Sequence, residues 1–262
     1  MSNVHLTSGP VRSLVVAAVA AVAALIATSP AFASDLNVQP ISIHLKPNRS
    51  SDTITVENRG SETIRIQVSG FAWDQDATGA MKLEPSNDLV FFPVLLTIEP
   101  GKKKSVRVGL QNTAPTAIEK TFRVFFEELP SVKSQLAPET TGLTLLSKFG
   151  VPVFLDPSKI APKPQLSVKG LQNGVLTVST GNAGNAHYIS TAVGIAGLDA
   201  RGAPVFDRSE KGWYVLAHGE REYAVSLGPK ECTALRDVTI ELKTSAGNVK
   251  QTMPVSPGSC GK

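Results

Sequence analysis

The chain has 262 residues, of which 42% are hydrophobic and 18% are charged, and its formal net charge is +4. This length allows one or two domains with hydrophobic cores of their own. The modest charge, without a basic face, excludes a protein built to bind nucleic acid. The 18 Pro and 21 Gly favour many short strands separated by turns over long helices.

The first 33 residues have the pattern of a secretory signal peptide. Arg12 precedes an unbroken apolar run over 13–27, and Ala31 and Ala33 then form an A-x-A cleavage site. The run is about 15 residues long, which is shorter than the roughly 20 residues of a membrane-spanning helix. An N-terminal membrane anchor is therefore the less favoured alternative. We expect the mature protein to begin near Ser34, to lie outside the cytoplasm and not to insert in a membrane.

Short runs with alternating apolar residues follow the signal peptide, and turn residues separate them. The expected strands of the first unit are 36–45, 52–58, 62–73, 89–98, 104–110, 121–130 and 143–155. Seven strands in about 120 residues, separated by turn signals, are typical of an immunoglobulin-like β-sandwich.

A break in this pattern marks a second unit. The segment DPSKIAPKPQ, over 156–165, has three Pro, two Lys and no apolar pattern, which is the composition of a linker. The expected strands beyond it are 165–170, 174–181, 188–197, 212–219, 222–228 and 237–244. The sequence therefore predicts an all-β protein with two immunoglobulin-like domains in tandem, over 34–157 and 158–262, after a signal peptide over 1–33.

Cys232 and Cys260 are the only cysteines. In an oxidising compartment, an even cysteine count favours a disulfide. The alternative is a reactive thiol pair, but the C-x-x-C spacing is missing. A bridge would close a loop of about 29 residues and stabilise the fold by about 3–4 kcal/mol on the chain-entropy model.

Motifs that carry catalysis are missing from the sequence. It contains no G-x-S-x-G, no H-E-x-x-H and no Walker loop. The four histidines are scattered along the chain, whereas a metal site needs three or four clustered ligands. Folding can bring distant residues together, so this argument covers local motifs alone. We expect no enzymatic activity, no metal and no cofactor.

The stretch TFRVFFEELP, over 121–130, has three Phe within five positions. The face that alternation directs towards a sandwich core consists of Phe122, Val124 and Phe126. The opposite face combines Arg123, Phe125 and Glu127. An exposed Phe between charged residues is unfavourable unless something covers it. We therefore expect something to cover this second face.

The next strand, over 143–155, is apolar on both faces in its first half, Leu143–Leu146. It follows a loop of about 13 residues, which is long for a connection between strands. An unprotected apolar edge strand either aggregates or binds a partner by strand addition. The alternative is that another strand of the same domain covers it.

The order of these motifs resembles the periplasmic chaperones of the chaperone–usher pathway of pilus assembly, in a divergent branch. The matching stretches are PISIHL…TITVEN, FPVLLTIEPGKKKSVRV, FRVFFEELP and the final strand entering VPVFLDP. The resemblance covers nearly all of the mature chain. It implies an L- or boomerang-shaped molecule, a cleft between its two domains and a location in the periplasm.

The resemblance also implies a mechanism. Such a chaperone binds and caps pilus subunits, which are incomplete sandwiches, and delivers them to an outer-membrane usher. It supplies the last strand of its first domain to the subunit, which is the donor-strand form of β-augmentation. Leu143 and Leu145 are then the first choices for donor residues, with Leu146 if the register shifts by one, and Ser147 continues the Leu143 face. We expect the free protein to cap its own edge as a homodimer.

Well-known members hold the subunit's C-terminal carboxylate with an Arg on the first strand and a Lys on the strand of the F…P motif. Alignment places Ser42 and Glu127 at these two positions, and neither is basic. Arg123 lies on the same strand face as Glu127, and an Arg binds carboxylates bidentately. We therefore expect Arg123 to be the anchor, with Lys148 or Lys46 as a helper. The alternative is that Arg123 merely pairs with Glu127.

A competing interpretation is a secreted two-domain adhesive or structural module without chaperone activity. It would share the two sandwiches and the disulfide. It would not need the apolar first half of the 143–155 strand.

Overall fold

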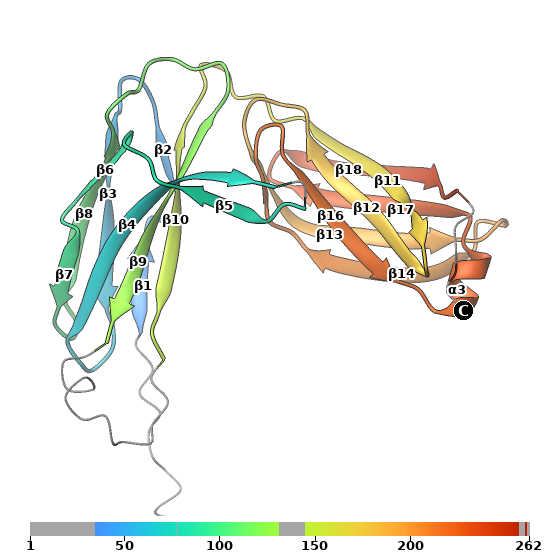
Figure 1. Cartoon of the computed structure of the whole chain (residues 1–262), viewed down its shortest axis with the longest axis horizontal. Helices are drawn as coiled ribbons and strands as arrows, with labels where there is room; N and C mark the ends of the chain where they lie inside the picture. Colours follow the sequence, from blue (N-terminus) through green and yellow to red (C-terminus); the bar gives the residue numbers. More distant parts are fainter. Residues whose placement is uncertain (1–34, 77, 131–144, 257–259, 261–262) are drawn as a thin grey trace, which may run out of the picture.

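The computed structural model describes residues 35–76, 78–130, 145–256 and 260. It contains two β-sandwiches, here domain one (35–155) and domain two (164–260), which form a bent molecule (Figure 1). The prediction of two immunoglobulin-like sandwiches is confirmed. None of the described helices is long and apolar enough to cross a membrane.

Domain one consists of two packed sheets. Its strands are β1 (Leu36–Gln39), β2 (Ile43–Leu45), β3 (Ser51–Asn58), β4 (Ile64–Gln75), β5 (Met81–Glu84), β6 (Leu89–Phe92), β7 (Leu95–Ile98), β8 (Lys103–Leu110), β9 (Lys120–Leu129) and β10 (Lys148–Leu155). One sheet has the order β1-β3-β8-β6. The other has the order β2-β10-β9-β4-β5, with β7 also paired to β4. The core between them includes the fully buried Ile54, Val56, Val106, Val124 and Phe126.

Two predicted strands of domain one are each divided at a proline. The run 36–45 forms β1 and β2, and the run 89–98 forms β6 and β7, so the prediction of one strand in each case is wrong. A proline lacks the N–H of a sheet ladder and fixes its own φ angle. The chain leaves one sheet at Pro40 or Pro93, each after a cis peptide bond, and enters the other sheet.

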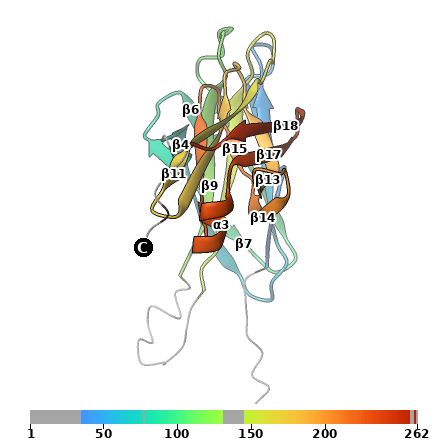
Figure 2. The same cartoon turned by 90° about the vertical axis from the view of Figure 1, so that its right-hand side faces the viewer.

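Domain two is a second sandwich, and its described elements are β11 (Pro164–Gln172), β12 (Val175–Asn182), β13 (Tyr188–Leu198), β14 (Pro204–Lys211), β15 (Tyr214–Val215), β16 (Glu220–Ser226), α3 (Pro229–Ala234), β17 (Asp237–Thr244) and β18 (Gly247–Pro254). The order β11-β12-β16 forms one sheet. The order β14-β13-β17-β18 forms the other, with β15 paired to β13. The helix α3 lies at the end of domain two that is remote from domain one (Figures 1 and 2).

Sequence patterns missed β5, β14, β18 and α3, and the expected strand 212–219 is reduced to β15. The strands β5 and β18 are exposed or partly exposed at every position, and most of β14 is exposed too. An edge strand that buries few side chains shows little apolar alternation. The six-residue α3 is too short for a helical period to be visible.

The disulfide expected between Cys232 and Cys260 is present in the structure. Cys232 belongs to α3 and is buried against the core of domain two, and Cys260 packs against the same core. The bridge therefore ties the end of the chain to the sandwich.

Candidate functional site

Both faces of β9 are buried from Phe122 to Phe126, whereas Glu127 is exposed. The core face consists of the buried Phe122, Val124 and Phe126, as expected. On the opposite face, Arg123 is 7% exposed and Phe125 8% exposed. The expectation that something covers this second face is therefore met at Arg123. The side chains that cover it come from β4, β5 and domain two.

One edge of β10 is only half paired. Along one side, β9 pairs with β10 from Lys148 to Leu155. On the other side, β2 pairs in parallel with Val153–Leu155 only. Among the described strands, no partner follows the remaining edge, over 148–152. Backbone groups of a free edge are available to a strand from another molecule.

Large apolar side chains lie at the same end of β10. Leu145 is 67% exposed, Leu146 is 46% exposed and Phe149 is 41% exposed. The described strand starts at Lys148, five residues later than expected, and Leu143 lies outside the described residues. Ser147 is tied to β9, because the backbone N–H of Glu128 donates to its carbonyl over 2.9 Å.

Arg123 lies among aromatic side chains. Its guanidinium carbon is 4.8 Å from the ring centre of Trp73 and 5.4 Å from that of Trp213. Nη1 donates to the Met81 sulfur over 3.3 Å, and the buried Nε has no hydrogen-bond partner. Burial lowers the pKa of Arg123 from its ordinary value, and the nearby Tyr214 opposes this shift.

Among the described residues, no carboxylate forms an ion pair with Arg123. Glu127, on the same face of β9, instead pairs with Lys148 over 2.6 Å. The alternative in which Arg123 merely pairs with Glu127 is therefore wrong. A buried cation without a counterion is costly, and stacking on aromatic rings offsets only part of that cost.

The two lysines considered as helpers do not converge on Arg123. Arg123 is directly opposite Pro152 in the register of β9 and β10. Lys148 lies four residues from Pro152 towards the start of β10, where Glu127 neutralises it. Lys46 follows β2, whose last residue pairs with Leu155 at the other end of β10.

Gly150 makes room for this arrangement. It pairs with Phe125 across β9 and β10. A Cβ at this position would lie 2.8 Å from the Arg123 Nε and 2.9 Å from a Phe125 ring carbon. Any larger residue at this position would therefore require the Arg123 or Phe125 side chain to shift.

The two domains meet beside Arg123. The hairpin of β4 and β5 extends towards domain two (Figure 1). Its Gln75 side chain donates to the carbonyl of Tyr214 over 2.8 Å and accepts the N–H of Leu216 over 2.9 Å. Trp73 and Phe154 of domain one pack with Leu216 of domain two in one apolar cluster.

A second set of contacts between the domains is polar. The buried Glu119 carboxylate accepts the backbone N–H of His187 over 3.0 Å and contacts its Nδ1 over 2.9 Å. The His187 ring stacks on Phe154 with a centroid distance of 3.9 Å. On the domain-one side, His44 pairs with Asp156 over 2.8 Å. These contacts fix domain two against β10 and thereby hold the cover over Arg123.

Comparison with known proteins identifies the family. Residues 35–161 match the family model described as pili and flagellar-assembly chaperone, PapD N-terminal domain. Through this domain, the chain belongs to the pilus-assembly chaperones. No curated protein matches the chain in sequence.

Solved structures of such chaperones share the fold. The CsuC–CsuE chaperone–tip adhesion subunit complex, from archaic chaperone–usher pili of Acinetobacter baumannii, has a chain that matches with TM-score 0.59 and 16% identity, covering 86% of this chain and 99% of that chain. The SafA pilin–SafB chaperone complex of Salmonella enterica matches with TM-score 0.53 and 14% identity, covering 86% and 99%. The periplasmic chaperone SfaE matches with TM-score 0.50 and 15% identity, again covering 86% and 99%. At these identities, the matches show a common fold.

The aromatic cover of Arg123 was not predicted. Trp73 and Trp213 are the only two Trp of the chaperone, and they lie 140 positions apart. Met81 belongs to the unpredicted β5. The sequence held one signal for this environment. The chain has few Trp, and it has an Arg without a partner on a strand face.

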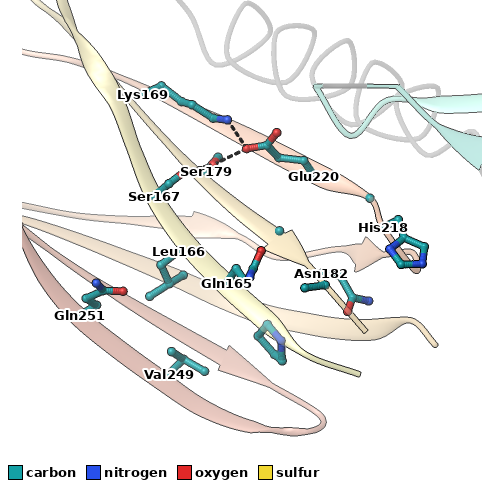
Figure 3. Close-up of a pocket in the computed structure, with 14 residues that line it drawn as sticks. Gln165, Leu166, Ser167, Lys169, Ser179, Asn182, His218, Glu220, Val249 and Gln251 are labelled. Carbon is teal, nitrogen blue, oxygen red and sulfur yellow. Dashed lines mark hydrogen bonds and ion pairs between the residues drawn. The ribbon is translucent and has the colours of Figure 1, made fainter. Parts of the chain in front are cut away.

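A polar pocket of about 780 Å³ lies in domain two of the chaperone. Figure 3 shows Lys169 and Ser179 directed at the carboxylate of Glu220, at 2.5 and 2.6 Å. These contacts lower the pKa of Glu220. The network joins β11, β12 and β16, so we assign it to the stability of this sheet. Across the described residues, no group of three or more His, Cys, Asp or Glu is placed to hold a metal ion.

Proposed function

We propose that this chaperone works in the periplasm, where it binds pilus subunits by donor-strand complementation and passes them to an outer-membrane usher. The subunit lacks its last strand, and the start of β10, with the residues before it, takes that place. Binding and release involve no covalent chemistry, so the protein acts without enzymatic activity and without a cofactor. The free protein caps the same edge as a homodimer.

The observation that carries this proposal is the half-paired start of β10. Its free backbone edge can extend the sheet of a subunit, and Leu145, or Leu146 if the register shifts by one, can enter an apolar pocket. Full burial of one Leu side chain contributes about 1.5–3 kcal/mol. Leu143 lies outside the described residues and stays a candidate donor, because alternation in the sequence would direct it as it directs Leu145 in an extended segment.

The location and the partners rest on separate support. The signal-peptide pattern over 1–33 favours export, and SfaE is described as a periplasmic chaperone. The CsuC–CsuE and SafA–SafB structures are complexes of chaperones with a tip subunit and a pilin. We infer the same class of partner here, because the fold and the family are shared.

We propose Arg123 as the anchor of the subunit's C-terminal carboxylate. It is a nearly buried cation in the angle between the domains and has no counterion among the described residues. A carboxylate would supply the missing acceptor and form charge-assisted hydrogen bonds. Lys148 would need to leave Glu127 in order to help, and Lys46 lies towards the far end of β10.

A pull-down from the periplasm tests the proposal. The tagged chaperone, produced in cells that make a candidate fibre subunit, is purified with its bound chains, which mass spectrometry identifies. The wild type and a matched surface variant, Ile160→Lys, are expected to retain an immunoglobulin-like subunit that lacks its last strand. Leu145→Lys is expected to lose it. If all three purify alone while the subunit is made, the chaperone mechanism fails and an adhesive module becomes the better explanation.

A further inference from the structure

Both tryptophans of the chain contact one side chain. Trp73 comes from β4 in domain one, and Trp213 immediately precedes β15 in domain two. Their ring centres are 4.8 and 5.4 Å from the guanidinium carbon of Arg123. A cation over the face of an aromatic ring is attracted by the ring's quadrupole, and Trp is the best partner. Arg123 is thus held from both domains.

The two tryptophans differ in their surroundings. Trp73 is 2% exposed and packs edge-to-face on Tyr214, so its ring is held in place beside Arg123. Trp213 is 39% exposed and contacts the next residue, Tyr214, edge-to-face. Trp213 is therefore the partly exposed member of the pair of rings that contact Arg123.

The backbone fixes the place of Trp213. The N–H of Ser190 in β13 donates to the Trp213 carbonyl over 2.9 Å. The preceding Gly212 lies so close to β13 that a Cβ there would be 2.0 Å from the Ser190 carbonyl oxygen. Domain two therefore presents the Trp213 ring at a defined position, although the ring itself is partly exposed.

Stacking covers the faces of the Arg123 guanidinium, and its edge lacks a strong hydrogen-bond acceptor. The N–H groups of a guanidinium lie at its edge, whereas aromatic rings cover its faces. Nε has no partner, and Nη1 has only the weak acceptor Met81 sulfur. A planar cation that is oriented in advance loses less side-chain freedom when a carboxylate binds.

We propose that Trp213 is a positioning residue of the carboxylate site, through which domain two orients the Arg123 guanidinium for the C-terminal carboxylate of a subunit. This inference rests on the proposed anchor role of Arg123. It extends that role, because subunit binding then depends on domain two although the donor strand belongs to domain one. Trp213 itself acts through Arg123 and needs no contact with the carboxylate.

A small probe tests the site without a subunit. N-acetyl-phenylalanine carries a chain-terminal carboxylate, and N-acetyl-phenylalaninamide is its uncharged match. Because both tryptophans lie at Arg123, intrinsic tryptophan fluorescence reports on this site. The wild type is expected to show a saturable change with the carboxylate and none with the amide. Arg123→Gln is expected to lose the change, and the linker variant Ile160→Lys, at an exposed position, to keep it.

Two variants of similar size then separate positioning from packing. Trp213→Leu keeps an apolar side chain without an aromatic face, and Trp213→Phe keeps such a face. We expect at least a fivefold weaker probe affinity for Trp213→Leu and less than a twofold change for Trp213→Phe, with Trp73 as the remaining reporter. Thermal unfolding of both variants shows whether they are folded.

The outcomes distinguish this inference from the function on which it rests. Equal affinity of Trp213→Leu and the wild type, with the response still lost in Arg123→Gln, would overturn the role of Trp213 and leave the anchor intact. Absence of any carboxylate response in the wild type would overturn both the anchor and the positioning. In that case, subunit capture that depends on Leu145 would still support the donor strand.

Discussion

Domain one and domain two share an architecture but differ in what they leave exposed. The exposed large apolar residues of domain one, with the residues just before β10, are Ile41, Met81, Leu83, Val90, Phe92, Val94, Leu95, Ile118, Leu145, Leu146 and Phe149. In the described part of domain two, Trp213 alone belongs to this class, and Ile160 lies in the linker. Domain two is also closed by a disulfide. This difference supports the proposal that domain one carries the binding surface and that domain two is a stable support.

Two stretches of domain one each contribute several of these exposed apolar side chains. One is the half-paired start of β10, and the other is the segment of β6 and β7 that includes Phe92 and Val94. From the first stretch, the free edge of β10 runs to Pro152, which lies opposite Arg123 in the register of β9 and β10. This combination is the reason to place subunit binding there.

The largest expected effect is on binding by domain one. Leu145→Lys combined with Leu146→Lys should weaken the affinity for a subunit by more than about 100-fold, because in either register a Lys replaces the Leu that an apolar pocket would bury. The change loses about 1.5–3 kcal/mol of burial and adds the cost of burying an ammonium group. Both side chains are exposed in a single copy of the chain, so the melting temperature of the monomer should not change. Titration of a purified subunit and thermal unfolding measure the two quantities. A loss of stability equal to the loss of affinity would assign these residues to folding instead.

The next effect separates stability from binding. Cys232→Ser combined with Cys260→Ser should lower the free energy of unfolding of domain two by about 3 kcal/mol, since the bridge closes a loop of this size. Domain one should keep its own unfolding transition. Calorimetry of the whole chain resolves the two. Equal destabilisation of both domains would show that the disulfide stabilises domain one as well as domain two.

The sequence predicted the sandwich strands that bury alternate side chains, and missed strands that do not. DTITVEN has a clear period of two, and its Ile54 and Val56 are fully buried. GNVKQTMP, in β18, pairs only with β17 at an edge and has no such period. Hydrogen bonds of the backbone determine an edge strand, and they leave little trace in side-chain polarity.

For the site, the strand face of Arg123 could be read from alternation, but its environment could not. The contact with Trp213 depends on how the two domains are placed, which the linker composition does not encode. The pairing of Glu127 with Lys148 depends on the register between β9 and β10. Register and domain placement result from packing of the whole chain.

A smaller effect concerns the joint between the domains. Gln75→Ala removes two hydrogen bonds to the backbone of domain two, each worth about 0.5–1.5 kcal/mol. Small-angle scattering should then show a wider distribution of shapes, with both sandwiches intact. Gln67→Ala, an exposed position on the same strand, is the matched control. An unchanged scattering curve for Gln75→Ala would mean that other contacts alone maintain the angle between the two domains.

The smallest effect lies within domain two. Glu220→Gln should cost less than about 1 kcal/mol at neutral pH, because the pair with Lys169 is partly exposed. The pKa of Glu220 is lowered in the folded state, so this stabilisation is present above the ordinary glutamate pKa and is lost as the pH falls through the lowered value. Denaturation curves across this range, with Glu222→Gln as the control, should converge for variant and wild type in acid. A difference that grows in acid would contradict the account.

Photocrosslinking at position 145 tests the central claim most directly. A benzophenone side chain is placed at Leu145 in one variant and at Ile160 in another, and cells that make the fibre subunit are irradiated. The account predicts a covalent adduct with the subunit from position 145, at a site in its apolar groove, and none from position 160. An adduct from position 160 alone, or from neither position while the subunit is bound, would contradict donor-strand binding at the start of β10.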